Sequence, residues 1–336
     1  MNRRELLRLM SLAGMLMATV QIEDIDWERL EHAQAGSGRL NAATVNEYQA
    51  LNSHLWRVFV LSKSKSAAMP FVRDQLEVLV NALRRSHGPA IHRQLCGVAG
   101  ELFQLAGEIY FDGNEYTSAA HCYTLGATAS KEAGAFDLWA CALTRHAYIS
   151  VYEEQFRAAA PVLELAAVLA GRGDSGLSTR HWVAAVQAET FAGLGDLSAC
   201  QRALDMAERV AHIEGVAHNG GWLRFDGSRL EEQRGTCYVQ LGQPDRAAGA
   251  LTDALRRSLS TRRRGGVLTD LAMVGVQRSD PAHITTHAEA ALAIARQTGS
   301  GFIAQRLRVL QAQLTPFLAV DKRVRRISNQ ITALST

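Results

Sequence analysis

The chain has 336 residues, of which 47% are hydrophobic and 21% charged, with a formal net charge of +3 and five cysteines. That charge is too small to predict binding to nucleic acid or to an anionic membrane, and no run of about 18 apolar residues predicts a membrane span. The cysteines lie far apart without a C-x-x-C pair. This favours small buried residues in a reducing cytoplasm over a disulfide framework or a zinc site.

Residues 1–40 are predicted to form N-terminal helices and a linker. Arg3 and Arg4 precede a short apolar stretch, a pattern that also fits a twin-arginine export signal. Glu5 interrupts that pattern and leucines follow at helical spacing, which favours a helix packed on the rest of the chain. Residues 41–93 carry two apolar periods without the spacing of small residues that the rest of the chain repeats, and are predicted to be an atypical capping helix pair.

Residues 94–315 repeat one spacing of small, aromatic and large residues. Its best copy contains Gly235, Tyr238, Gly242, Ala247 and Leu251. The small residues let two helices approach, Tyr238 and Leu251 fill the space between them, and Gly242 suits the positive φ of a helix end. We therefore expect an all-α fold, a right-handed tetratricopeptide-like helical-repeat solenoid.

Three further segments complete the predicted organisation. Residues 212–228 are expected to be an exposed loop with Trp222 and Phe225 tucked back. The arginines at 256–257 and 262–264 are expected at a helix C-terminus, where cations complement the dipole, with Gly265-Gly266 as a connection; phosphate binding is the alternative. Residues 316–336 are predicted to be a C-terminal capping helix, whose apolar seam also fits a homodimer contact.

Several of these stretches suggest a family. The runs RGTCYVQLG (234–242) and RRRGGVLTDLA (262–272) are the most specific. With the closing RLRVLQAQLTPF, they resemble the C-terminal helical-repeat half of actinobacterial transcription regulators, in which an Xre-type helix-turn-helix precedes the array. The resemblance covers residues 90–320. The opening NRRELLRLMSLAG is similar to the linker that follows the DNA-binding module in such proteins.

The chain departs from that family because we expect it to lack the helix-turn-helix. The resemblance therefore implies a cytoplasmic sensing or protein-interaction array, without sequence-specific nucleic acid binding by this chain alone. The broader group includes receptors that bind short signalling peptides on the concave face.

Motifs for chemistry are scarce. The sequence has no nucleotide-binding, nucleophile-elbow or zinc-protease motif. His283 and His287 stand at i, i+4 but lack an evident third metal ligand. We therefore predict a non-enzymatic protein without cofactor or metal, whose partner is a peptide or a protein. A scaffold subunit without a small ligand is the alternative, and an enzyme is a more distant one.

The candidate binding residues come from helix geometry. In each repeat the first helix lines the concave side, and the residue after the first small one is rotated by about 100° into the groove. This stripe and the turn before it give the predicted site: Gln104, Glu108, Tyr148, Glu189, Arg229 and Glu232. The carboxylates are expected to repel one another and so to favour a ligand with cationic or amide donors. Replacing Glu189 is expected to leave folding nearly intact. A solvated face is the alternative.

Overall fold

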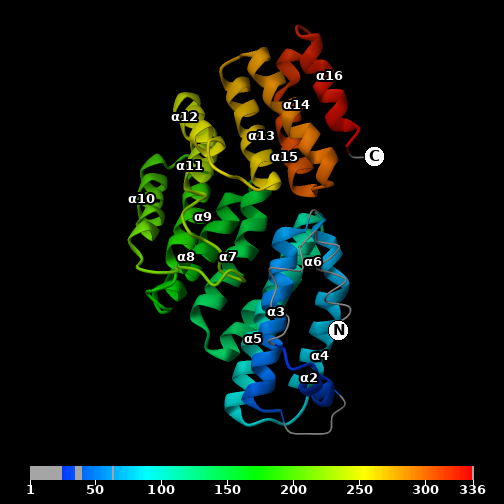
Figure 1. Ribbon diagram of the computed structural model, residues 1–336. Helices are drawn as coiled ribbons and strands as arrows, with labels where there is room; N and C mark the ends of the chain where they lie inside the picture. The colour runs from blue at the N-terminus through cyan, green and yellow to red at the C-terminus, as the bar shows by residue number, and fades with distance from the viewer. Residues whose placement is uncertain (1–24, 35–39, 63, 335–336) are drawn as a thin grey trace.

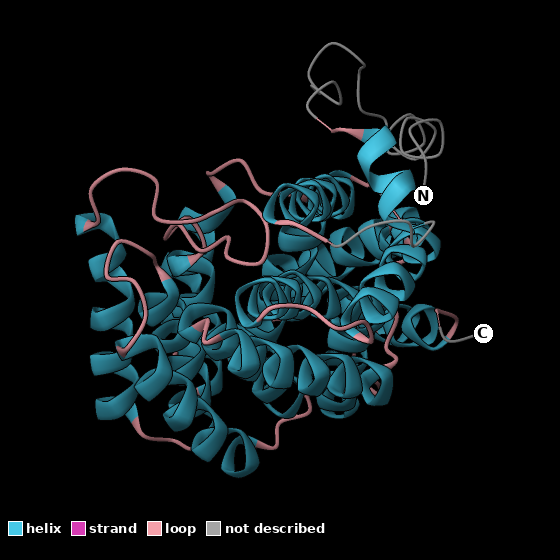
Figure 2. Cartoon of the chain, turned by 90° about the horizontal axis from the view of Figure 1, so that it is seen from below, coloured by secondary structure: helices cyan, strands magenta, loops and turns pink. Residues whose placement is uncertain are grey.

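The computed structural model describes residues 25–34, 40–62 and 64–334, so the predicted N-terminal segment 1–20 lies outside the described residues. Within these ranges every regular element is a helix (Figure 2), and the all-helical prediction is confirmed. The helices are α2 (Trp27–Gln34), α3 (Ala42–Leu61), η3 (Lys65–Ala68), α4 (Met69–Leu83), α5 (Pro89–Asp112), α6 (Tyr116–Ala133), α7 (Phe136–Tyr152), α8 (Phe156–Gly171), α9 (Thr179–Gly193), α10 (Leu197–Glu208), η4 (Arg209–His212), α11 (Leu230–Gln240), α12 (Pro244–Leu255), α13 (Thr261–Gln277), α14 (Pro281–Thr298), α15 (Gly301–Gln313), η5 (Thr315–Phe317) and α16 (Lys322–Thr332).

Helices α3 and α4 pack on α5 around large apolar side chains, among them Tyr48 and Trp56, which are 1% and 0% exposed. The last carbonyls of α3 have no partner within the helix. Lys65 Nζ satisfies them by donating to the carbonyl oxygens of Phe59 at 2.6 Å and Ser62 at 2.9 Å. Lys65 therefore fixes the end of α3 close to the repeat array.

The repeat array consists of antiparallel pairs from α5/α6 to α13/α14, packed through the small residues that the sequence predicted. A Cβ atom on Gly107 would lie 2.3 Å from Tyr123 Cε1, and one on Gly235 would lie 2.5 Å from Leu251 Cδ2. Tyr123 and Leu251 are 1% and 0% exposed, and burying such a side chain stabilises the fold by about 1.5–3 kcal/mol. Gly242 has the expected positive φ of 65°.

The first helices of successive pairs contact one another and form an inner layer: α5, α7, α9, α11, α13 and α15. Figure 1 shows that the chain curves from α3–α6 through α7–α12 to α13–α16, and that α13 and α15 return towards the N-terminal helices. We call the surface of this inner layer the concave face.

The arginines at 262–264 correct one expectation, because α13 begins at Thr261 and places them in its first turn. Ser260 caps this helix, its Oγ accepting from the Arg263 N–H at 3.4 Å. Gly265 and Gly266 lie inside α13 and are not a connection. A Cβ atom on Gly265 would lie 2.6 Å from Ile303 Cδ1, so this glycine lets α15 approach closely.

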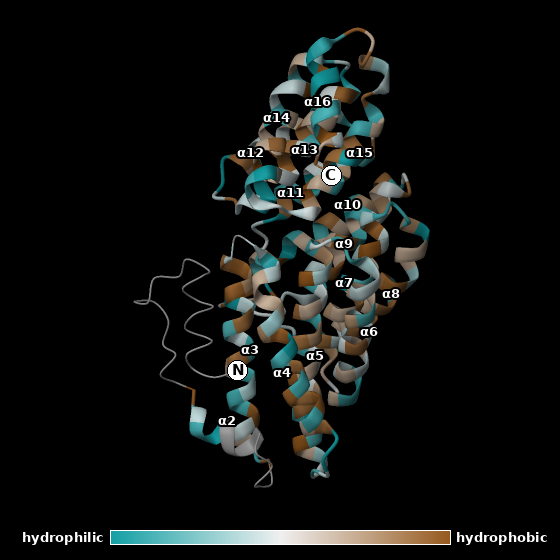
Figure 3. Cartoon of the chain, turned by 90° about the vertical axis from the view of Figure 1, so that its right-hand side faces the viewer, coloured by the Kyte–Doolittle hydropathy of each residue, from teal (hydrophilic) through white to brown (hydrophobic). Residues whose placement is uncertain are grey.

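The C-terminal helix α16 closes the array. Val324, Ile327 and Ile331 are 0% exposed and belong to one core with residues of α14 and α15. The apolar seam that also fitted a homodimer contact is thus covered within the chain. Basic residues of α16 remain outside, and Figure 3 shows this helix as largely hydrophilic on its outer side.

Candidate functional site

The concave face is organised around Glu108 of α5. Its Oε1 atom lies 3.3 Å from Arg145 Nε and accepts a hydrogen bond from the Tyr123 hydroxyl at 3.0 Å, while its Oε2 atom lies 3.5 Å from Arg224 Nη2. Burial alone would raise the pKa of Glu108, but Arg145, Arg224 and Arg262 outweigh it and hold that pKa below its ordinary value. Glu108 is therefore an ion-paired carboxylate.

Arg145 connects α5 to the rest of the face. Its side chain is 5% exposed. Nη1 donates to Gln104 Oε1 at 2.8 Å and Nη2 donates to the Trp222 carbonyl at 2.7 Å. Gln104 is 0% exposed and donates in turn to the Leu138 carbonyl at 3.0 Å. Gln104 thus holds Arg145 in place and offers no free group to a ligand.

Glu189 of α9 and Tyr148 of α7 lie in the middle of the face. Glu189 is only 6% exposed, and Gln233 Nε2 donates to its Oε1 at 3.5 Å. Burial raises the pKa of Glu189 to about 7, and Arg306 opposes this only in part. Burial also raises the pKa of the Tyr148 hydroxyl. Glu189 is therefore buried and is not the solvent-facing charge on which the expectation of nearly intact folding was based.

The two predicted residues at the start of α11, Glu232 and the N-cap residue Arg229, differ in their pairing. Glu232 is ion-paired, since Arg263 Nε lies 2.9 and 3.1 Å from its two carboxylate oxygens and Arg263 Nη2 donates to the Ser228 carbonyl at 2.8 Å. Arg229 is exposed, and its side chain has no hydrogen-bond or ion-pair partner within the part of the chain that the structure describes. Desolvation by the surrounding protein lowers the pKa of the Arg229 guanidinium group, and the charge of Arg263 lowers it further.

Asp270 of α13 anchors a third ion pair, with Arg306 of α15. The Thr236 hydroxyl donates to Asp270 Oδ2 at 2.6 Å. The guanidinium of Arg306 also lies 5.7 Å from the centre of the Phe302 ring. Asp270 therefore joins α11, α13 and α15 at the concave face.

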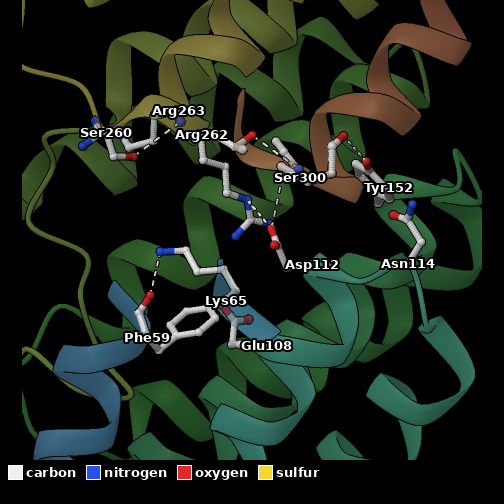
Figure 4. A network of polar contacts seen from close by, with 12 residues as sticks. Phe59, Lys65, Glu108, Asp112, Asn114, Tyr152, Ser260, Arg262, Arg263 and Ser300 are labelled. Carbon is white, nitrogen blue, oxygen red and sulfur yellow. Dashed lines mark hydrogen bonds and ion pairs between the residues drawn. The ribbon is translucent and has the colours of Figure 1, made fainter. Parts of the chain in front are cut away.

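The two ends of the array meet where α13 and α15 reach the end of α5 (Figure 4). Asp112 Oδ1 lies 3.2 Å from Arg262 Nε and accepts from the Ser300 hydroxyl at 3.4 Å. The Tyr152 hydroxyl donates to the Phe302 carbonyl at 2.6 Å, and their rings stack with centres 5.3 Å apart. We call this set the end contact.

Lys65 lies beside the end contact (Figure 4). Its pKa falls to about 8, mainly through burial and then through Arg262. The N-terminal helices, the first repeat and the last repeats therefore share one charged region.

Residues 213–229, which we call the inner segment, form the helix-free loop that the sequence predicts at 212–228, with Val216 76% exposed and Trp222 and Phe225 tucked back. Leu223 and Phe225 are 0% and 4% exposed, and Trp222 packs on the N-terminal core. The Ser178 N–H donates to the Ala217 carbonyl at 2.8 Å, and the Ser178 hydroxyl donates to the Phe225 carbonyl at 2.5 Å. Together with the bond from Arg145 to the Trp222 carbonyl, these contacts hold a helix-free stretch on the inner layer.

A cavity of about 310 Å³ lies beside the inner segment, between α3, α5 and the start of α7. Its lining includes Glu101, Leu138 and Trp222. Glu101 is 5% exposed, and burial raises its pKa to about 8. A Cβ atom on Gly221 would lie 3.2 Å from Glu101 Oε1, so the absent side chain at this position lets the inner segment cover the carboxyl group.

The charge balance overturns the predicted repulsion between carboxylates, because Glu108 and Glu232 each have an arginine partner and Glu189 is buried. Among the charged groups described above, cations outnumber carboxylates. The cations are Lys65, Arg145, Arg224, Arg229, Arg262, Arg263 and Arg306; the carboxylates are Glu101, Glu108, Asp112, Glu189, Glu232 and Asp270. Sequence reasoning missed most of these cations. Arg145 could have been found, since it lies on α7 one turn before Tyr148.

Comparison with known proteins agrees with the architecture. No family model matches the chain, and no curated protein matches its sequence. The inner layer of first helices, each followed by an antiparallel outer helix, defines a tetratricopeptide-like helical-repeat solenoid. The chain is similar to a Rap protein whose crystal structure is of a complex with competence and sporulation factor, with a TM-score of 0.50 and 10% sequence identity over 99% of this chain and 97% of that one. The predicted fold class is confirmed.

The finer resemblance to Xre-type regulators stays a prediction. Among the described helices, none is long and apolar enough to cross a membrane.

Proposed function

We propose that this protein is a non-enzymatic binding array that takes a peptide, or an extended segment of a partner protein, on its concave face. The inner segment is the observation that carries the proposal. It is a helix-free stretch of polypeptide whose carbonyls at Ala217, Trp222 and Phe225 accept hydrogen bonds from the inner layer. A surface that binds one extended chain through its backbone has the chemistry to bind another.

The charges of the face favour an acidic ligand. Arg229 is exposed there without a partner in the described part of the chain, while the carboxylates are paired or buried. Guanidinium groups bind carboxylates in a bidentate geometry. We therefore propose a ligand with a free C-terminal carboxylate or an acidic side chain next to Arg229, flanked by Tyr148 and Glu189. Glu108, Glu232 and Gln104 then position the arginine side chains to which they are bound.

The structural neighbour supports a binding function, because that Rap protein was crystallised in a complex with competence and sporulation factor. The relation to the sensor half of bacterial transcription regulators, a cytoplasmic location and the four-part division at residues 40, 93 and 315 remain our proposals from the sequence. A scaffold role without a small ligand is the competing function.

A binding assay with labelled short peptides tests the proposal. We expect peptides with an acidic or free C-terminus to raise the fluorescence anisotropy, and their amidated neutral counterparts to bind more weakly. A hydrogen bond to a charged group contributes about 1.5–3 kcal/mol, so Arg229→Ala should weaken binding by about tenfold or more. Arg256→Ala is the matched control, because Arg256 is 75% exposed and pairs with Asp253 within α12 and its cap.

Two results would contradict the proposal. Equal affinity of the Arg229 and Arg256 variants would place the ligand elsewhere on the molecule. If no peptide in the series binds while native mass spectrometry of protein from its own host shows a retained protein subunit, the scaffold function replaces the peptide-binding one.

A further inference from the structure

A second group of reactive side chains lies at the start of the first repeat, apart from the groups that pair across the concave face. His92 and Cys96 stand one turn apart on α5, and Glu132 reaches them from the last turn of α6. His92 Nε2 lies 3.2 Å from Glu132 Oε1 and 3.5 Å from Cys96 Sγ. The three ligand atoms all lie within 4.8 Å of one another.

The two separations at His92 match edges of a metal coordination shell. Zinc binds sulfur at about 2.3 Å, imidazole nitrogen at about 2.0–2.1 Å and carboxylate oxygen at about 2.0–2.2 Å, with tetrahedral angles. Those bond lengths place the sulfur and nitrogen about 3.5 Å apart and the nitrogen and oxygen about 3.3 Å apart. The distances at His92 are 3.5 and 3.2 Å.

Hydrogen bonds through His92 cannot satisfy Glu132 and Cys96 at the same time. Both neighbours approach the same atom, His92 Nε2. If Nε2 carries a hydrogen, it donates to Glu132 and cannot accept the thiol proton of Cys96. If it does not, it faces the Glu132 carboxylate with a lone pair. One cation between the three atoms satisfies all of them.

We propose that His92 Nε2, Cys96 Sγ and a carboxylate oxygen of Glu132 bind a Zn²⁺ ion, with a fourth position open to water or an added ligand. A mixed nitrogen, sulfur and oxygen set suits this borderline-soft cation. Cys96 is 4% exposed, whereas the side chains of His92 and Glu132 are 37% and 57% exposed, so the ion would have a shielded thiolate and an open outer side.

The binding step exchanges one ion for one proton. The Cys96 sulfur loses its proton to solvent as the Zn–S bond forms, and no oxidant or reductant is needed. A cysteine thiol has an ordinary pKa of about 8.5, so it carries its proton at neutral pH before a metal binds. Metal uptake should therefore release about one proton per chain at pH 7.

This site is independent of the proposed peptide function. It would link the start of α5 to the end of α6, two elements that the first repeat already packs together. The sequence alone predicts no metal and offers only His283 and His287 as a histidine pair, whose ring centres lie 4.4 Å apart. The described residues bring no carboxylate or thiol together with that pair.

A cobalt titration of the reduced, chelator-treated full chain tests the proposal, because Co²⁺ replaces Zn²⁺ and gives a thiolate charge-transfer band. We expect one equivalent of Co²⁺ to develop the band, Zn²⁺ to abolish it, and Zn²⁺ to raise the melting temperature. Cys96→Ser should remove the band. Cys122→Ser is the matched control, since Cys122 is also buried and belongs to no such cluster among the described residues.

Glu132→Gln keeps the proposal testable if the Cys96 variant does not fold, because Glu132 is exposed. Circular dichroism can check that the Glu132→Gln protein keeps its helix content. Loss of a residue that only supports a metal ligand costs about 10–100-fold in affinity, so loss of the Glu132 ligand should cost at least as much. Absence of saturable Co²⁺ binding to the wild-type chain, or a band that survives in Cys96→Ser, would overturn the site.

Discussion

The ion pairs of the concave face differ from those on the outside of the array. Inside, Asp270 and Arg306 come from different repeats, and their side chains are 10% and 19% exposed. Outside, Asp253 and Arg256 stand three residues apart, with side chains 57% and 75% exposed. Buried pairs lose hydration that outer pairs keep, so an inner pair holds helices in register and is costly to break, whereas an outer pair contributes little.

Removal of one inner carboxylate should give the largest effect. Asp270→Ala leaves Arg306 without its counter-charge and the Thr236 hydroxyl without its acceptor. We expect the free energy of unfolding to fall by about 3 kcal/mol, as when a buried pair loses one partner. Urea denaturation measures this free energy. The control is Asp253→Ala, which should change the free energy of unfolding by about 0.5 kcal/mol or less. Equal losses in the two variants would remove the distinction between inner and outer pairs.

Glu189 should make stability depend on pH in a defined direction. Its pKa is about 7 in the native state against an ordinary value of 4.5. Between these values the native state keeps a proton that the unfolded chain has lost, so this group makes stability fall as pH rises from about 4.5 to about 7. Glu189→Gln removes that loss and should be more stable than the wild type at pH 8, by at most about 3 kcal/mol.

The same pair of proteins at pH 4 supplies the control, since both the native and the unfolded wild-type chain then hold the proton. Unfolding curves that differ equally at pH 4 and pH 8 would show that Glu189 does not titrate in the predicted window.

An outer pair between two helices should give the smallest effect. Arg326 of α16 donates to Glu289 of α14 at 3.0 Å, but their side chains are 68% and 48% exposed. We expect Arg326→Ala to change the free energy of unfolding by about 0.5 kcal/mol or less, and added salt to reduce even that. A loss comparable to that of Asp270→Ala would mean that contact between helices, and not burial, determines the strength of these pairs.

The sequence predicted the fold because the repeat packing is local. Gly235 meets Leu251 within a single helix pair, so a short spacing contains the whole contact. The candidate site was predicted in part: the stripe along the inner helices located Glu108 and Glu232. Their partners come from other elements, and no periodicity marks Arg224, which approaches Glu108 from 116 residues away in the helix-free inner segment.

Two other features of the structure differ from the predictions made from the sequence, each for a physical reason. Arginines 262–264 look like a helix end when only charge is considered, but the Ser260 cap makes them a helix start. The cluster at His92 was invisible because its third member, Glu132, lies 40 residues further along the chain. Only the antiparallel return of α6 brings the two together.

The end contact changes how such an array should unfold. In an open solenoid each repeat touches only its neighbours, so ends can fray while the middle persists. Here Tyr152 and Phe302 are joined across 150 positions, and Asp112 and Ser300 across 188. Loss of the last repeats therefore removes contacts from the first, and amide hydrogens at the two ends should exchange together as one cooperative unit. Such long loops must close before these contacts form, which predicts that the end contact assembles late in folding.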